Sequence, residues 1–207
     1  MNKVFISSLA ITIIFFTSCN SNNDGKVHEG HEMNKDTVQH ASASADDSVK
    51  EVAVIYSNVD AKLTASIKEI VNHYLHIKNA LANDKSSDAA EGADAMVKAI
   101  GNIDKSLLTA EQKKLYDDNE EDLKEHAEHI GKNSSNIKHQ REHFSMMSED
   151  VYALVKAFSA GQPLYHDHCP MYNEKKGAIW LSEIKEIKNP YYGGEMPTCG
   201  KVMEVIK

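Results

Sequence analysis

The stretch that decides the fold is LTASIKEIVNHYLHIKNAL, residues 63–81. Its apolar side chains recur every three or four residues, the spacing that places them on one face of an α-helix. The members of this stripe are Leu63, Ile67, Ile70, Val71, Tyr74, Ile77 and Leu81. The sequence therefore predicts a long amphipathic first helix that begins near Val59.

Three further helical segments follow the first. Residues 84–87 interrupt the pattern, and residues 89–103 form an Ala-rich second segment. Thr109 with Gln112 resembles a capping box that opens a third helix, which ends near Gly131. The fourth segment runs from about residue 133 to 159, where Gly161-Gln162-Pro163 stops it. We predict an all-α fold: an up-and-down four-helix bundle, with the turn-rich residues 163–207 packed on it as a compact extension.

The N-terminus has the pattern of an export signal. A basic start is followed by an apolar run from Val4 to Phe16 and by Thr17-Ser18-Cys19. This predicts a signal peptide over residues 1–18 and a lipid-bearing Cys19, hence a membrane anchor and a place in the cell envelope, facing the periplasm or the cell surface. The alternative is an ordinary signal peptide with an incidental cysteine.

The next segment, residues 19–56, is predicted to be a flexible tether, and residues 57–207 the folded domain. The tether contains His28, His31 and Met33, a tract that can bind metal without a fold or can be a solvated spacer. Removal of the predicted signal peptide takes away Lys3. The remaining chain has 22 basic residues against 31 acidic ones, a net charge of about −9. Nucleic acid is therefore not an expected partner.

Two short clusters in the C-terminal part combine thiol and thioether groups. Cys169 lies two residues before Met171, and Met196 lies three residues before Cys199. Thiolate and thioether are soft ligands that select Cu(I), whereas zinc takes thiolate and imidazole. We therefore predict a Cu(I) site, with zinc as the second choice. A Cys169–Cys199 disulfide without any metal is the alternative that remains open.

Histidines at helical spacing supply further candidate ligands. On the third helix two histidines share a face at i, i+3, and on the fourth two histidines and a methionine share a face at i, i+4 and i+7. A helical projection places His126 and His143 at the edges of the apolar stripes of their helices. It places His129 and His139 further from these stripes. For each one the alternative is a surface or hydrogen-bonding role. The candidates are His126, His129, His139, His143 and Met146, with His166 and His168 beside Cys169.

Several longer motifs give the chain a family resemblance. They are residues 140–144 (QREHF), Tyr165, Cys169-Pro170-Met171, residues 177–182 (GAIWLS), residues 187–193 (IKNPYYG) and residues 196–200 (MPTCG). In these motifs the chain resembles a domain of unknown function that occurs in bacterial lipoproteins and at the C-terminus of CusB-like heavy-metal efflux adaptor proteins. The resemblance covers roughly Val59 to Lys207. It implies copper or other heavy-metal handling in the envelope.

The positions that match the motifs of this domain include His143 beside the two Cys/Met clusters, so the resemblance implies one ligand set: Cys169, Met171, Met196, Cys199 and His143. The chain lacks the hairpin, lipoyl-like and barrel segments of an adaptor. The function expected from these observations is a non-enzymatic lipoprotein that buffers copper or delivers it to a heavy-metal efflux complex. The alternative is a disulfide-closed structural or protein-interaction module without a metal.

Overall fold

The first helix of the bundle forms where the apolar spacing predicts it. The computed structural model describes residues 49–207, and in it α1 spans Ala61–Ala82. Asp60 caps this helix, because its side chain accepts hydrogen bonds from the backbone N–H groups of Lys62 and Leu63. All seven residues of the predicted stripe are buried. The expectations for residues 1–18, Cys19, His28, His31 and Met33 lie outside the described residues.

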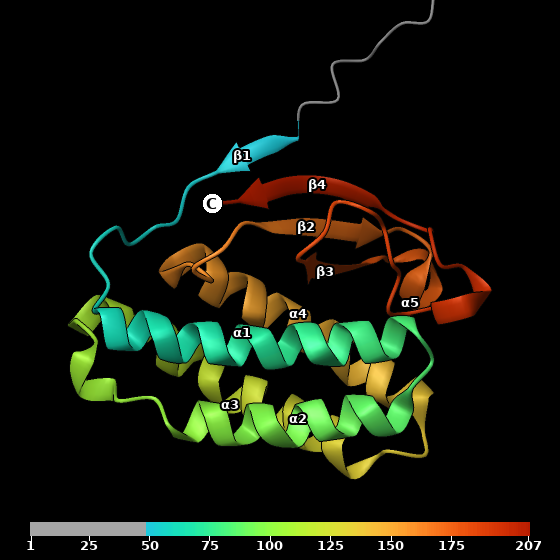
Figure 1. The fold of residues 1–207 in the computed structure, drawn as a ribbon, viewed down its shortest axis with the longest axis horizontal. Coiled ribbons are helices and arrows are strands. Elements are labelled where there is room, and N and C mark those ends of the chain that lie inside the picture. The colour runs from blue at the N-terminus through green and yellow to red at the C-terminus, as the bar shows by residue number, and fades with distance from the viewer. Residues whose placement is uncertain (1–48) are drawn as a thin grey trace, which may run out of the picture. The chain divides into compact units, whose positions relative to one another are not determined.

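The remaining helices complete a four-helix bundle. They are α2 (Ser86–Gly101), α3 (Ala110–Lys132) and α4 (Ile137–Phe158), with a short 3-10 turn η1 at Lys105–Leu107. The capping box of Thr109 and Gln112 is present with both of its hydrogen bonds. Each helix packs on the next, and α4 returns to α1, which closes the up-and-down arrangement (Figure 1). In the described residues 49–207, no helix is long and apolar enough to cross a membrane.

The prediction of an all-α fold is wrong for the C-terminal part, which forms a sheet. Its strands are β1 (Lys50–Val52), β2 (Leu164–Cys169), β3 (Ala178–Ser182) and β4 (Lys201–Ile206), in the order β1-β4-β2-β3. The short α5 (Tyr172–Lys175) and the 3-10 turn η2 (Gly193–Glu195) lie between strands. The strands have only three to six residues, and a register shift between His166 and Asp167 breaks the alternation of β2. Their pattern is therefore too short and irregular to be read from the sequence.

The sheet packs on α1 and α4, and α2 and α3 lie on the opposite side of the bundle (Figure 1). A buried hydrogen-bond chain joins the two layers. The Leu181 N–H donates to the Tyr74 hydroxyl at 3.0 Å, and this hydroxyl lies 2.9 Å from the Ser148 hydroxyl. Because Ser148 donates to the Phe144 carbonyl, Tyr74 is the donor to Ser148. Sheet and bundle therefore share one core.

The folded part begins before residue 57, so the predicted end of the tether needs correction. β1 pairs with β4 in parallel, and the Lys207 N–H donates to the Val52 carbonyl at 3.1 Å. Next along the chain, the Ile55 and Tyr56 N–H groups donate to carbonyls at the end of α4. The Tyr56 ring also packs on Phe158 with ring centroids 5.5 Å apart. These interactions join the two ends of the described chain, a pairing that the local sequence does not reveal.

A chain that begins at residue 57 is expected to be less stable than one that begins at residue 49. It loses the β1 pairing and the buried part of Tyr56, together worth roughly 2 kcal/mol or more, which corresponds to a drop in Tm of several degrees. Thermal unfolding followed by circular dichroism measures the difference. Equal Tm values for the two chains would show that residues 49–56 contribute nothing to the fold.

Candidate metal centre

The last two helices bring four histidines together. α3 carries His126 and His129, α4 carries His139 and His143, and the two helices pack against each other as a hairpin. Gln140 is buried at the start of this hairpin, and its side-chain amide donates to the Ser86 and Ile130 carbonyls. The beginning of α4 is therefore fixed to the end of α3 beside the histidines.

The four rings form one cluster with His143 at its centre. The His143 ring stacks on His129 at a centroid distance of 4.1 Å and meets His139 edge-on at 4.6 Å. Its Nδ1 lies 3.2 Å from the Nδ1 of His126. One ring nitrogen from each of His129, His139 and His143 can be chosen so that all three lie within 4.8 Å of one another.

The cluster favours neutral imidazoles, the form that binds metal. Burial and, to a lesser degree, the neighbouring histidines lower the pKa of His143 to about 4. Burial also lowers the pKa of His126. At neutral pH these two rings therefore have a free lone pair for a hydrogen bond or a metal ion.

Two carboxylates flank the cluster, and sequence reasoning had not selected them. Glu125 Oε1 lies 3.8 Å from His129 Nε2, and Glu142 Oε2 lies 3.7 Å from His139 Nδ1. A carboxylate beside a ligating imidazole fixes the tautomer and the ring orientation. The i, i+4 spacing of Glu125 with His129 and the i, i+3 spacing of His139 with Glu142 are the sequence signals that point to these pairs.

The two cysteines form a second, separate group in the sheet layer. His168 on β2 pairs with Lys201 on β4, so the residues that follow and precede them, Cys169 and Gly200, lie at the same end of the strand pair. The Sγ atoms of Cys169 and Cys199 lie 3.4 Å apart, and both thiols are free. This distance exceeds a disulfide bond of about 2.05 Å. It is shorter than the separation of about 3.8 Å between two thiolates on one tetrahedral zinc ion.

The structure thus divides the predicted ligand set in two. His143 stacks on His129 of α3, whereas Cys169 lies at the end of β2 in contact with Cys199. In the described residues, the group of side chains close enough to share one ion contains His143 with His129 and His139 and neither cysteine. The single site of cysteines, methionines and His143 implied by the family resemblance stays a prediction.

Residues 70–163 match the model of a family described as protein of unknown function, DUF3347. Over this range the chain is similar to the DUF3347 family. The matched range contains most of the bundle and all four clustered histidines, and it ends before either cysteine. No similar curated protein and no similar solved structure was found. The match confirms the resemblance to a domain of unknown function; the association with lipoproteins and efflux adaptors stays a prediction.

Two further candidate ligands, His166 and His168, lie on β2. The His166 ring packs on Tyr152 at a centroid distance of 4.5 Å, and its Nδ1 lies 3.7 Å from Glu204. His168 lies against Gly177, where an added Cβ would be 2.4 Å from its Nε2. These two histidines therefore belong to the sheet.

Two of the predicted methionine ligands lie near the cysteines in the chain. The Met171 side chain is 43% exposed, and its backbone carbonyl accepts a hydrogen bond from the Tyr192 hydroxyl. Met196 is half-buried and accepts, through its carbonyl, the Cys199 N–H. Their backbone contacts hold the two cysteine loops in place.

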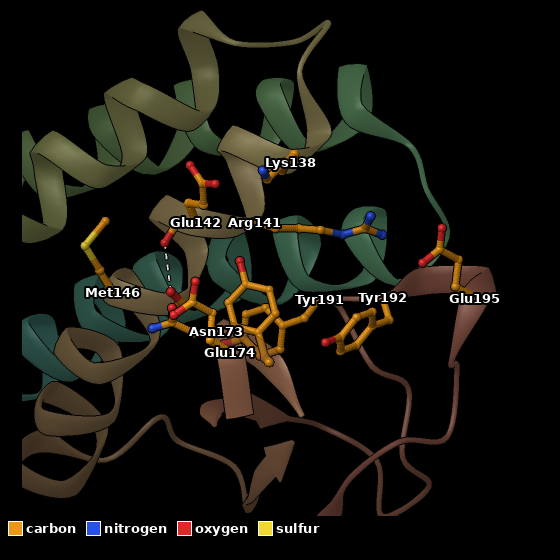
Figure 2. Close-up of a pocket in the computed structure, with 11 residues that line it drawn as sticks. Lys138, Arg141, Glu142, Met146, Asn173, Glu174, Tyr191, Tyr192 and Glu195 are labelled. Carbon is orange, nitrogen blue, oxygen red and sulfur yellow. Dashed lines mark hydrogen bonds between the residues drawn. The ribbon is translucent and has the colours of Figure 1, made fainter. Parts of the chain in front are cut away.

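A cavity of about 720 Å³ lies between α4 and the C-terminal segments 172–174 and 191–195 (Figure 2). Arg141 forms part of its wall and is already engaged, because its guanidinium donates to the Pro190 and Leu81 carbonyls and to Asp84. Glu142 and Met146 also face this cavity from α4. Glu142 is the carboxylate beside His139, so the cavity lies next to the histidine cluster.

Proposed function

We propose that the protein binds a soft or borderline transition-metal ion, copper first and zinc second, at the histidine cluster of α3 and α4. The observation that carries the proposal is the convergence of His129, His139 and His143, whose ligand nitrogens fall within 4.8 Å. Three imidazoles leave one position of a four-coordinate ion open. An open position suits a protein that takes up a metal and passes it on.

Both proposed metals fit imidazole ligands. Copper is placed first because the same molecule holds two free thiols 3.4 Å apart and an exposed thioether, Met146, on the histidine stripe of α4. Such soft groups favour Cu(I), whereas zinc rarely takes a thioether. The thiol pair would then be a second, softer site in the sheet.

The proposed role is a non-enzymatic one in the cell envelope: to buffer the metal or to deliver it to a heavy-metal efflux complex. Support comes from the export pattern of residues 1–18 with Cys19, which would attach the protein to a membrane through a lipid. The resemblance to the domain of efflux adaptors supports the choice of partner.

A structural or protein-interaction module, closed by a disulfide, is the second candidate. The observation that favours it is the 3.4 Å approach of the two thiols, of which Cys169 is fully buried. A disulfide that closes a loop of this size contributes roughly 3–4 kcal/mol to stability in the chain-entropy model.

Thiol alkylation followed by metal titration tests the proposal. Purified protein with both thiols reduced and alkylated is expected still to bind one equivalent of copper or zinc, because the histidine cluster needs no thiol. If the alkylated protein binds neither metal, and protein isolated without reductant has no free thiol, the disulfide-closed module is the correct function.

A further inference from the structure

Met146 is an exposed thioether beside the histidine cluster. Its side chain is 43% exposed, in a helix whose neighbouring residues Phe144, Met147 and Ser148 are buried. It lies three residues after His143 and seven after His139, on the same stripe of α4. An exposed apolar side chain on this stripe contributes little to the core, which leaves its sulfur available to a ligand.

The same side chain faces the cavity described above. Met146 and Glu142 lie on the α4 wall, and Tyr172, Asn173 and Tyr191 lie on the opposite wall (Figure 2). Glu142 also lies 3.7 Å from His139. The cavity and the histidine cluster are therefore next to each other along one edge of α4, and Met146 lines the cavity one helical turn after His143.

The far wall of the cavity has an unusual backbone. Asn173, Glu174 and Lys175 all have positive φ angles, 50°, 56° and 68°, a conformation that costs roughly 1–2 kcal/mol for each residue with a side chain. The Tyr192 hydroxyl, which donates to the Met171 carbonyl, helps to hold this turn. The turn keeps the wall at a distance from α4, and a space of about 720 Å³ remains.

We propose that Cu(I) reaches the histidine cluster, and leaves it, through this cavity, with Met146 as the first protein ligand that the ion meets. The inference rests on the proposed metal binding at the cluster. It adds to that proposal the path of the ion and the residue, Met146, that selects the metal. The thioether binds the incoming Cu(I) while the ion is still bound to a small donor molecule in the cavity. The ion then passes to His143, one helical turn away, and no bond other than metal–ligand bonds forms or breaks.

The softness of the sulfur gives the path its selectivity. A thioether binds Cu(I) well and zinc poorly, whereas the imidazoles of the cluster accept both metals. Met146 should therefore accelerate the exchange of Cu(I) and have no effect on zinc. Since the ion finally lies among the imidazoles, Met146 should change the rate of transfer and not the number of ions bound.

Stopped-flow transfer of Cu(I) from a small chelator to the purified protein tests this inference. A Cys199→Ser background removes the thiol pair, so that the histidine cluster is the site observed. Met146→Leu keeps the volume of the side chain but cannot bind a metal, and it is expected to slow Cu(I) transfer about tenfold or more. Zinc transfer and the final stoichiometry should be unchanged. Met203→Leu is the matched control, because Met203 is 44% exposed and lies on β4.

Two results would overturn the inference. Cu(I) transfer to Met146→Leu at the rate of the Met203→Leu control would show that the thioether plays no part. An equal slowing of zinc and Cu(I) would show that Met146 acts through shape and not as a soft ligand. A failure of the proposed function is recognised separately, since the cluster would then bind neither metal in the Cys199→Ser background at any time.

Discussion

Replacing His143 by alanine is expected to lower the affinity of the protein for copper and zinc by at least about 100-fold, more than the loss of an outer-shell partner usually costs. His143 has this large effect because it is in contact with all three other histidines: it stacks on His129, meets His139 edge-on and pairs with His126. Its removal leaves two imidazoles where three converged. Competition titration with a chelator for each metal, in thiol-alkylated protein, measures the loss.

His73→Ala is the control for this variant. His73 is a half-buried histidine of α1 and is not part of the cluster, so its replacement should leave both affinities unchanged. If His143→Ala retains the wild-type affinity while Cys169→Ser loses it in unalkylated protein, the metal binds at the thiol pair and the histidine cluster is a structural contact.

Much of the bundle could be predicted because its signals are local. The apolar residues of 63–81 repeat within one helix, the capping box spans three residues, and Gly161-Gln162-Pro163 ends the last helix within a few residues of its observed end at Phe158. The sheet could not be predicted in the same way. β1 and β4 come from the two ends of the described chain, and a three-residue strand has no periodicity of its own.

The candidate site shows the same division between local and nonlocal signals. Helical spacing correctly placed His126 with His129, and His139 with His143, on shared faces. The projection of single helices pointed His129 and His139 outward, yet the structure joins them at 3.4 Å between Nδ1 and Nε2. A projection of one helix does not include the neighbour that covers its edge. The approach of Cys169 to Cys199 likewise depends on the pairing of β2 with β4.

Asp167 is a buried carboxyl group with a large expected effect on the pH dependence of stability. It lies on β2 with no exposed surface, and neither carboxylate oxygen has a hydrogen-bond partner. Burial raises its pKa from 3.8 to about 8, although the positive charge of Lys78 acts in the opposite direction. Lys78 is itself held by Glu183 at 2.8 Å and so does not neutralise Asp167 directly.

The raised pKa fixes the sign of the pH dependence. Well below pH 4 the carboxyl is protonated in both the folded and the unfolded chain, so it adds no pH dependence to the free energy of unfolding. As the pH rises from about 4 to 8, the unfolded chain releases the proton and the folded protein retains it, so the free energy of unfolding falls. The loss from this one group is on the order of 4 kcal/mol at pH 7.

Asp167→Asn is therefore expected to stabilise the protein at neutral pH by up to this amount and to have little effect at pH 4, since asparagine has nearly the same shape and no proton to lose. Urea unfolding of both proteins at several pH values gives the free energy of unfolding of each. In the difference between the two free energies, the contributions of all other titratable groups cancel. Asp118→Asn, at an exposed position of α3, should show no such trend. If Asp167 is instead ionised and paired with Lys78 in the folded protein, the asparagine variant will be the less stable one at pH 7, because Lys78 would lose a buried counter-charge.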